Sequence, residues 1–255
     1  MSRSVDAAAV LVEIAVESVA GAVAATGAGA DRLELCQSLQ QGGLTPSPGL
    51  LAGVRARVSL PLQVLIRPRG GDFLYDDGEF AVMGADVGAA RSAGADGIVC
   101  GVLCADGSID RERMRELAAL AAPLPLTCHR AFDLCADQAL ALECLIALGC
   151  TRVLTSGAAA TAPEGQDRIK TLVAQAGARI AVMAGAGVHD HNVAALVAHT
   201  GVHEVHLSAA VRQPSSMRYR RAGVPMGAIA PPDEYELRAT DGAMVARVLA
   251  ALRRR

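Results

Sequence analysis

The stretch that decides the fold is G-A-D-R-L-E-L-C, residues 29–36. A glycine followed by a polar pair and an alternating apolar run is typical of a helix end leading into a strand. Similar turns recur as G-A-D-G at 94–97 and as G-C-T-R at 149–152. Every second strand–helix unit therefore shares one helix-to-strand turn.

Outward from this stretch, short apolar runs alternate with helical patterns along the chain. The expected strands are 10–14, 32–36, 62–67, 97–101, 125–129, 152–154, 179–183 and 204–207. The expected helices are 18–26, 48–58, 79–93, 110–121, 138–148, 165–176, 189–199 and 240–252, with Thr240 as the N-cap of the last. Eight such units in about 250 residues predict an α/β fold of the (β/α)8 type, a TIM-like barrel.

An open, doubly wound sheet is the alternative, because it also alternates strands and helices. The absence of G-x-G-x-x-G after the first strand favours the barrel. We expect a single barrel domain over residues 1–255. A long connection rich in proline and arginine, at about 211–239, precedes the last helix, and its length indicates a functional or interface-forming segment.

The composition excludes several classes of protein. The net charge of −2 and the aromatic content of 2% argue against nucleic-acid binding. No run is apolar enough to span a membrane, and Glu13 and Glu17 interrupt the apolar stretch that could resemble a signal peptide. Seven scattered cysteines are typical of reduced thiols, so we expect a cytoplasmic protein. The single lysine, Lys170, argues against a Schiff-base aldolase or a Walker loop.

The loop I-R-P-R-G-G-D-F at 66–73 combines cations, an anion and a flexible backbone at a strand end. Arg67 and Arg69 offer planar donors that suit carboxylates or phosphates. The glycine pair lets a ligand approach the main chain. The alternative is a structural turn closed by an ion pair between Arg69 and Asp72.

Period-two alternation places a set of polar side chains in the barrel lumen. The set comprises Glu13, Glu34, Cys36, Arg67, His129 and, less clearly, His206. At the catalytic end of a barrel, such groups indicate acid–base chemistry. The candidate catalytic residues are Glu13, Glu34, Arg67, His129 and Asp133.

Two structural alternatives stay open for these residues. Glu13 and Glu34 could form a buried ion-pair network with Arg67 and Arg32. The second motif, C-H-R-A-F-D at 128–133, could be a structural clamp between its arginine and its aspartate rather than an acid–base pair.

An anion site is expected near the ends of strands seven and eight, the usual phosphate site of this fold. Gly185 and Gly187 expose backbone N–H groups before a helix, and Ser208 adds a hydroxyl. Arg69 completes the predicted anion-binding set. Ordinary strand-to-helix turn chemistry is the alternative.

The cysteines show no C-x-x-C spacing, and most are expected in the core. Cys36, beside Glu34 in the lumen, and Cys104 are the candidate metal ligands, because thiolates suit Cu(I).

The motifs together resemble the CutC family of copper homeostasis proteins. The matching segments are A-D-R-L-E-L-C (30–36), G-G-L-T-P-S (42–47), I-R-P-R-G-G-D-F-L-Y (66–75), G-A-D-G-I-V (94–99), D-G-S-I-D (106–110), H-R-A-F-D (129–133), R-V-L-T-S-G (152–157) and E-G (164–165). The resemblance covers about residues 10–210 and implies a cytoplasmic TIM-like barrel, a homo-oligomer and a proposed link to Cu(I). The family cysteine that follows the E-L pair falls on Cys36.

Three positions depart from the family pattern. Gly185-Ala186-Gly187 replaces three glycines, Cys128 replaces a phenylalanine, and the segment 208–210 lacks an arginine. The last change weakens the anion-site hypothesis most.

Two functions therefore stay open. One is a cytosolic copper-homeostasis-type protein, a dimer or tetramer, that binds or handles Cu(I) and uses no organic cofactor. The other is a barrel enzyme that acts on a small anionic or phosphorylated metabolite by acid–base chemistry.

Overall fold

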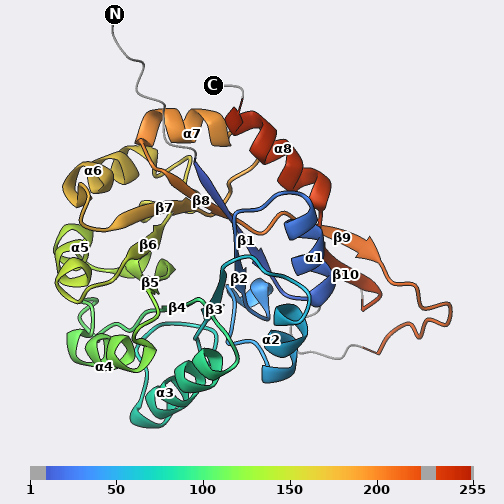
Figure 1. The fold of residues 1–255 in the computed structure, drawn as a ribbon, viewed down its shortest axis with the longest axis horizontal. Helices are drawn as coiled ribbons and strands as arrows, with labels where there is room; N and C mark the ends of the chain where they lie inside the picture. Colours follow the sequence, from blue (N-terminus) through green and yellow to red (C-terminus); the bar gives the residue numbers. More distant parts are fainter. Residues whose placement is uncertain (1–9, 225–233, 254–255) are drawn as a thin grey trace, which may run out of the picture.

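The structure, a computed structural model, describes residues 10–224 and 234–253 and is a closed barrel of eight parallel strands (Figure 1). The strands are β1 (Leu11–Val16), β2 (Arg32–Leu35), β3 (Leu62–Leu65), β4 (Gly97–Cys100), β5 (Leu126–Cys128), β6 (Arg152–Thr155), β7 (Ala181–Gly185) and β8 (Glu204–Leu207). Each strand pairs with the next in the chain, and β8 pairs with β1. The expected (β/α)8 barrel is confirmed.

A ring of helices surrounds the strands. They are α1 (Val19–Gly27), α2 (Pro48–Arg55), α3 (Asp77–Ser92), α4 (Arg111–Ala121), α5 (Gln138–Ala147), α6 (Gln166–Ala176), α7 (Val193–Thr200) and α8 (Gly242–Arg253), with short 3-10 helices at Leu39–Gln41 and Arg130–Leu134. None of the helices in the described ranges combines the length and hydrophobicity needed to cross a lipid bilayer.

Local signals explain where the helices begin. Side chains at several N-caps accept a hydrogen bond from a backbone N–H of the first turn, which satisfies a donor that the helix itself cannot pair. These caps are Ser18, Ser47, Asp76, Asp110 and Asp137. Asp76 forms a full capping box with Glu79.

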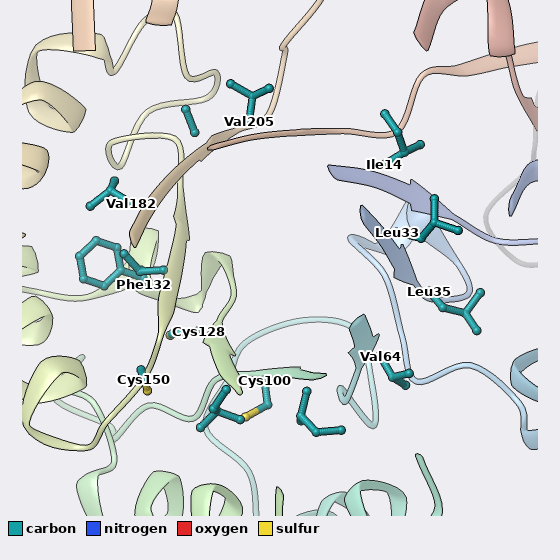
Figure 2. Close-up of a cluster of buried hydrophobic side chains, with 14 of the residues drawn as sticks. Ile14, Leu33, Leu35, Val64, Cys100, Cys128, Phe132, Cys150, Val182 and Val205 are labelled. Atoms are coloured by element: carbon teal, nitrogen blue, oxygen red, sulfur yellow. The ribbon is translucent and has the colours of Figure 1, made fainter. Parts of the chain in front are cut away.

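The main core lies between the barrel and the helices. Figure 2 shows side chains such as Ile14, Leu33, Leu35 and Val64 in this layer. Three of the cysteines expected in the core, Cys100, Cys128 and Cys150, are buried there.

The lumen holds a polar layer instead. The guanidinium of Arg32 bridges the carboxylates of Glu13 and Glu204, and Arg152 also pairs with Glu204. The buried ion-pair network that was the structural alternative is present for Glu13 and Arg32. Arg67 and Glu34 make other contacts, described below, because they lie nearer the carboxyl ends of their strands.

The connection before α8 contains a hairpin that the sequence analysis did not anticipate. β9 (Ala210–Pro214) and β10 (Glu236–Thr240) pair antiparallel beside α1 (Figure 1). Residues 225–233 of the connection lie outside the described residues. The prediction that Thr240 is an N-cap is wrong, because Thr240 ends β10 and the Asp241 side chain accepts the N–H of Ala243 instead.

Candidate functional site

A pocket of about 320 Å³ opens at the carboxyl ends of the strands. It is lined by Glu34, Leu39, Gln41, Gly42, Leu65, Arg67, Gly71, Phe73, His129, Arg130, Asp133, Leu134, Leu154 and His206. These residues come from β2, β3, β6, β8 and the loops that follow β2, β3 and β5. Its size and its mixture of apolar and charged walls suit a small-molecule ligand.

The central polar contact of the pocket joins β8 and β2, the two strands that flank β1. Nε2 of His206 on β8 lies 2.8 Å from Oε2 of Glu34 on β2, and both side chains are largely buried. Burial alone would raise the pKa of Glu34, but the charge and hydrogen bond of His206 lower it overall. Burial alone would lower the pKa of His206, but Glu34 and, to a smaller extent, Glu13 raise it overall. Both shifts favour the charged forms, a carboxylate on Glu34 and an imidazolium on His206.

Glu13 lies beneath this pair. Its Oε2 accepts from Arg32. Its buried Oε1 has no hydrogen-bond partner among the described residues and lies 3.9 Å from Nε2 of His206. Burial raises the pKa of Glu13, although Arg32 and His206 oppose this effect. Glu13 does not line the pocket, so it acts on the site through its neighbours.

His129 contributes a neutral ring to the pocket wall. Its Nδ1 accepts the backbone N–H of Ala131 at 3.1 Å, while its buried Nε2 has no hydrogen-bond partner in the part of the chain that the structure describes. Burial, with help from the charge of Arg67, lowers the pKa of His129 to about 4. The expected pairing of His129 with Asp133 is absent from the hydrogen bonds of residues 10–224 and 234–253, because the 3-10 turn directs the ring to its own backbone.

Arg67 shapes the pocket through its backbone contacts. Its two Nη atoms donate to the carbonyl oxygens of Gln41, Gly43 and Gly71, and its guanidinium stacks on the ring of Phe73. These contacts occupy most of the donors that the sequence analysis assigned to a substrate anion. Arg67 therefore serves mainly to hold the loops after β2 and β3.

Asp133 pairs with Arg130, which is the structural clamp considered as an alternative to an acid–base role for this motif. Its carboxylate accepts from Thr155, from Ser156 and from Arg130 at 2.8 Å, and also from the N–H of Ala158. The carboxylate is saturated, so the structure does not favour a catalytic role for it. Arg130 is different: its side chain is 42% exposed at the rim.

The four predicted anion ligands lie apart from the pocket lining. Arg69 bonds to Glu79 and pairs with Asp72 at 3.0 Å, which is the structural turn considered as an alternative. Gly185 ends β7, Gly187 packs against Thr161, and Ser208 follows β8.

The two predicted metal ligands do not form a metal centre in the described structure. Cys36 is fully buried against Leu65 and Val99, and burial raises the pKa of its thiol far above the ordinary value. Cys104 is half-buried. Within the described ranges, the single set of three or more clustered potential ligands is Glu13, Glu34 and His206. Carboxylates and imidazole do not suit Cu(I) as thiolates do, so these residues do not fit that ion.

His206 was not among the predicted catalytic residues, although the alternation along its strand placed it, less clearly than the others, in the lumen. The apolar part of the wall consists of Leu39, Leu65, Phe73, Leu134 and Leu154, of which the alternation along the third strand had grouped only Leu65 with Arg67. These residues lie far apart in the chain, and only barrel closure brings them together.

Comparison with known proteins gives a consistent result. Residues 10–211 match the model of the CutC family. A family protein CutC from Chromobacterium violaceum is 50% identical over 95% of this chain and 98% of its own length. The human "copper homeostasis protein cutC homolog" is 49% identical over 91% of this chain and 85% of its own. The crystal structure of a CutC from Streptococcus agalactiae superposes with a TM-score of 0.73 at 35% identity, covering 77% of this chain and 97% of that one.

Proposed function

We propose that this chain, which belongs to the CutC family, acts in the cytoplasm on a small anionic metabolite. The reaction would use acid–base chemistry in the barrel pocket. The observation that carries the proposal is the buried pair of Glu34 and His206, which lines a pocket large enough for a metabolite. Perturbed acid–base pairs in a cleft are typical of functional sites.

The opposite pKa shifts suit the two partners to complementary roles. Glu34, whose pKa is lowered, is a carboxylate at neutral pH and can accept a proton from the ligand. His206, whose pKa is raised, is shifted toward the protonated form and can return a proton. Because they share one hydrogen bond, transfer to one changes the proton affinity of the other.

The remaining walls define the ligand. Apolar side chains from Leu39, Leu65 and Phe73 cover one part of the pocket. Arg130 lines the rim, and its Nη1 forms no hydrogen bond among the described residues, so it can hold a carboxylate or phosphate. The proposed ligand is a compact metabolite with one anionic group.

The test is a thermal-shift and calorimetric screen of carboxylated and phosphorylated metabolites. We expect at least one to bind and stabilise the wild type, and to lose affinity in Glu34→Gln. The matched control is Glu143→Gln, which removes an exposed carboxylate on α5 outside the pocket and should leave binding unchanged. If every ligand found binds Glu34→Gln as well as wild type, the proposal fails.

The names of the relatives favour a second candidate, a direct role in copper homeostasis through Cu(I) binding. In this candidate the ligands are Cys36 and Cys104, and Cys36 must become exposed before it can bind. Stoichiometric Cu(I) uptake against a competing chelator, lost in Cys36→Ser and retained in Cys144→Ser, would support it. Equal uptake by wild type and Cys36→Ser would exclude this thiol.

A further inference from the structure

We infer that the ligand carries a carbonyl group whose oxygen accepts a hydrogen bond from Nε2–H of His129, and that the reaction removes a proton from the adjacent carbon. This inference rests on the proposed function, since it uses the same pocket and the same pair, Glu34 and His206. It adds the class of substrate and a role for His129.

The backbone fixes the tautomer of His129. A backbone N–H can only donate, so Nδ1, which receives the N–H of Ala131 at 3.1 Å, carries a lone pair. In a neutral imidazole the proton then sits on Nε2. Burial and the charge of Arg67 keep the ring neutral, so Nε2–H is a donor with defined geometry.

This donor has no partner within the described chain. Nε2 of His129 is buried and makes no hydrogen bond with residues 10–224 or 234–253. A buried donor without a partner is unfavourable and is rare unless it serves a function. Because the ring lines the pocket, a ligand oxygen is the partner that would satisfy it.

The character of the donor points to a carbonyl rather than a phosphate. A neutral imidazole offers one N–H and no charge, whereas a phosphate prefers several charged donors. A neutral imidazole held beside a carbonyl oxygen polarises it and stabilises negative charge as that charge develops. Burial and the positive charge of Arg67 disfavour the imidazolium, and the negative charge of Glu34 offsets them only in part, so the ring stays neutral.

Glu34 is the group that would accept the proton in the same reaction. Oε2 of Glu34 is bonded to His206, and Oε1 forms no hydrogen bond in the described ranges, so it is the oxygen open to a substrate proton. The charge of Glu34 acts on His129, so both groups border one small volume. A substrate there can present a carbonyl oxygen to His129 and an adjacent C–H to Glu34.

The step conserves atoms and charge. The C–H bond breaks and its proton forms an O–H bond with Glu34, while the electron pair becomes the C=C bond of an enolate and the carbonyl electrons move to oxygen. His129 donates to that oxygen without losing its proton. For solvent exchange, Glu34 trades its proton with water and returns one to the same carbon, and the enolate electrons re-form C=O. For isomerisation of a hydroxyketone, His206 protonates the enolate oxygen, the neighbouring hydroxyl gives its proton to the now neutral His206, and Glu34 protonates the former carbonyl carbon.

The experiment uses pairs of probes that differ only at the carbonyl. Dihydroxyacetone phosphate and hydroxyacetone are compared with glycerol 3-phosphate and propane-1,2-diol, by thermal shift and by proton NMR in D₂O. We expect the carbonyl compounds to stabilise the protein and to exchange the protons beside the carbonyl. In His129→Asn, which can still accept the N–H of Ala131, exchange should fall roughly 10²–10³-fold.

A second readout does not depend on a variant. With a ¹³C-labelled carbonyl, the bound resonance should move downfield as the C=O bond is polarised. Equal binding of the reduced probes, an unshifted resonance, or full exchange in His129→Asn would overturn the inference. If anionic metabolites bind in a Glu34-dependent way without any of these signs, the proposed function stands and the inference alone fails.

Discussion

Lowering the pH should destabilise this protein more than a variant in which His129 cannot titrate. The matched variant is His129→Asn, because asparagine is a favourable N-cap and can accept the N–H of Ala131, as the imidazole does. The comparison isolates one group, since the other carboxylates and histidines are common to both proteins.

The structure sets the expected size and sign of the effect. The pKa of His129 is about 4 in the folded protein, against an ordinary value of 6.5. A folded pKa below the unfolded one contributes stability that is complete above pH 6.5 and is lost as the pH falls toward about 4. From pH 7 to pH 4.5 the loss attributable to this group is about 2.5 kcal/mol.

The assay is thermal unfolding of both proteins at several pH values from 7.5 to about 4.5. For a domain of this size, the difference corresponds to a fall in Tm that is roughly 5–10 °C larger for wild type than for His129→Asn. Proton NMR of the folded wild type should also show a His129 ring resonance that does not move until the pH is near 4.

Parallel loss of Tm in the two proteins, or a ring that titrates near pH 6.5, would refute the reasoning. Either result would mean that the imidazole is charged at moderate pH, so it could not serve as a neutral donor in the pocket.

Three further predictions concern the lumen and the loops around it. Arg32→Met should lower the free energy of unfolding by about 3–5 kcal/mol, because it leaves the buried carboxylate of Glu13 without its cation. Urea unfolding of the double variant should show that Glu13→Gln recovers part of this loss. Gly43→Ala should lower the free energy of unfolding by about 1–3 kcal/mol, since the φ of Gly43 is +89° and the new Cβ would lie 2.6 Å from a methyl of Leu65. Gly49→Ala is the control: its Cβ would have no neighbour within 4 Å, so it should be neutral or slightly stabilising in the same assay. Cys36 should resist iodoacetamide in the folded protein and react after unfolding, because it is 0% exposed; mass spectrometry of labelled peptides would contradict this if Cys36 reacts before the half-buried cysteines.

Much of the fold could be predicted because its elements are local. The eight strands and eight helices of the barrel depend on apolar periodicity, glycine stops and polar N-caps, all of which act within a few residues. Most boundaries agree within a few residues; the largest shift is at α7, which begins at Val193 after a turn held by the Asn192 side chain. The hairpin of β9 and β10 was missed because its strands are separated by more than twenty residues and pair only with each other.

The sequence predicted which candidate side chains face the barrel lumen, but not which groups they contact there. Alternation along β2 correctly placed Glu34 in the lumen, because a strand has only two faces. It could not show that its partner is His206, 172 residues away, since that contact depends on how the barrel closes. The same limit applies to Arg67, whose donors are taken by carbonyl oxygens of two loops.

The sequence by itself determined the family, the barrel and the polar character of its lumen, because these follow from motifs and from short-range periodicity. Only the tertiary structure decided which polar groups are satisfied within the protein and which are not. Asp133 and Arg67 are occupied by backbone and side-chain partners, whereas Nε2 of His129 has none among the described residues. The physical reason is that hydrogen-bond saturation depends on the positions of all neighbouring donors and acceptors, which are set by packing across the whole barrel.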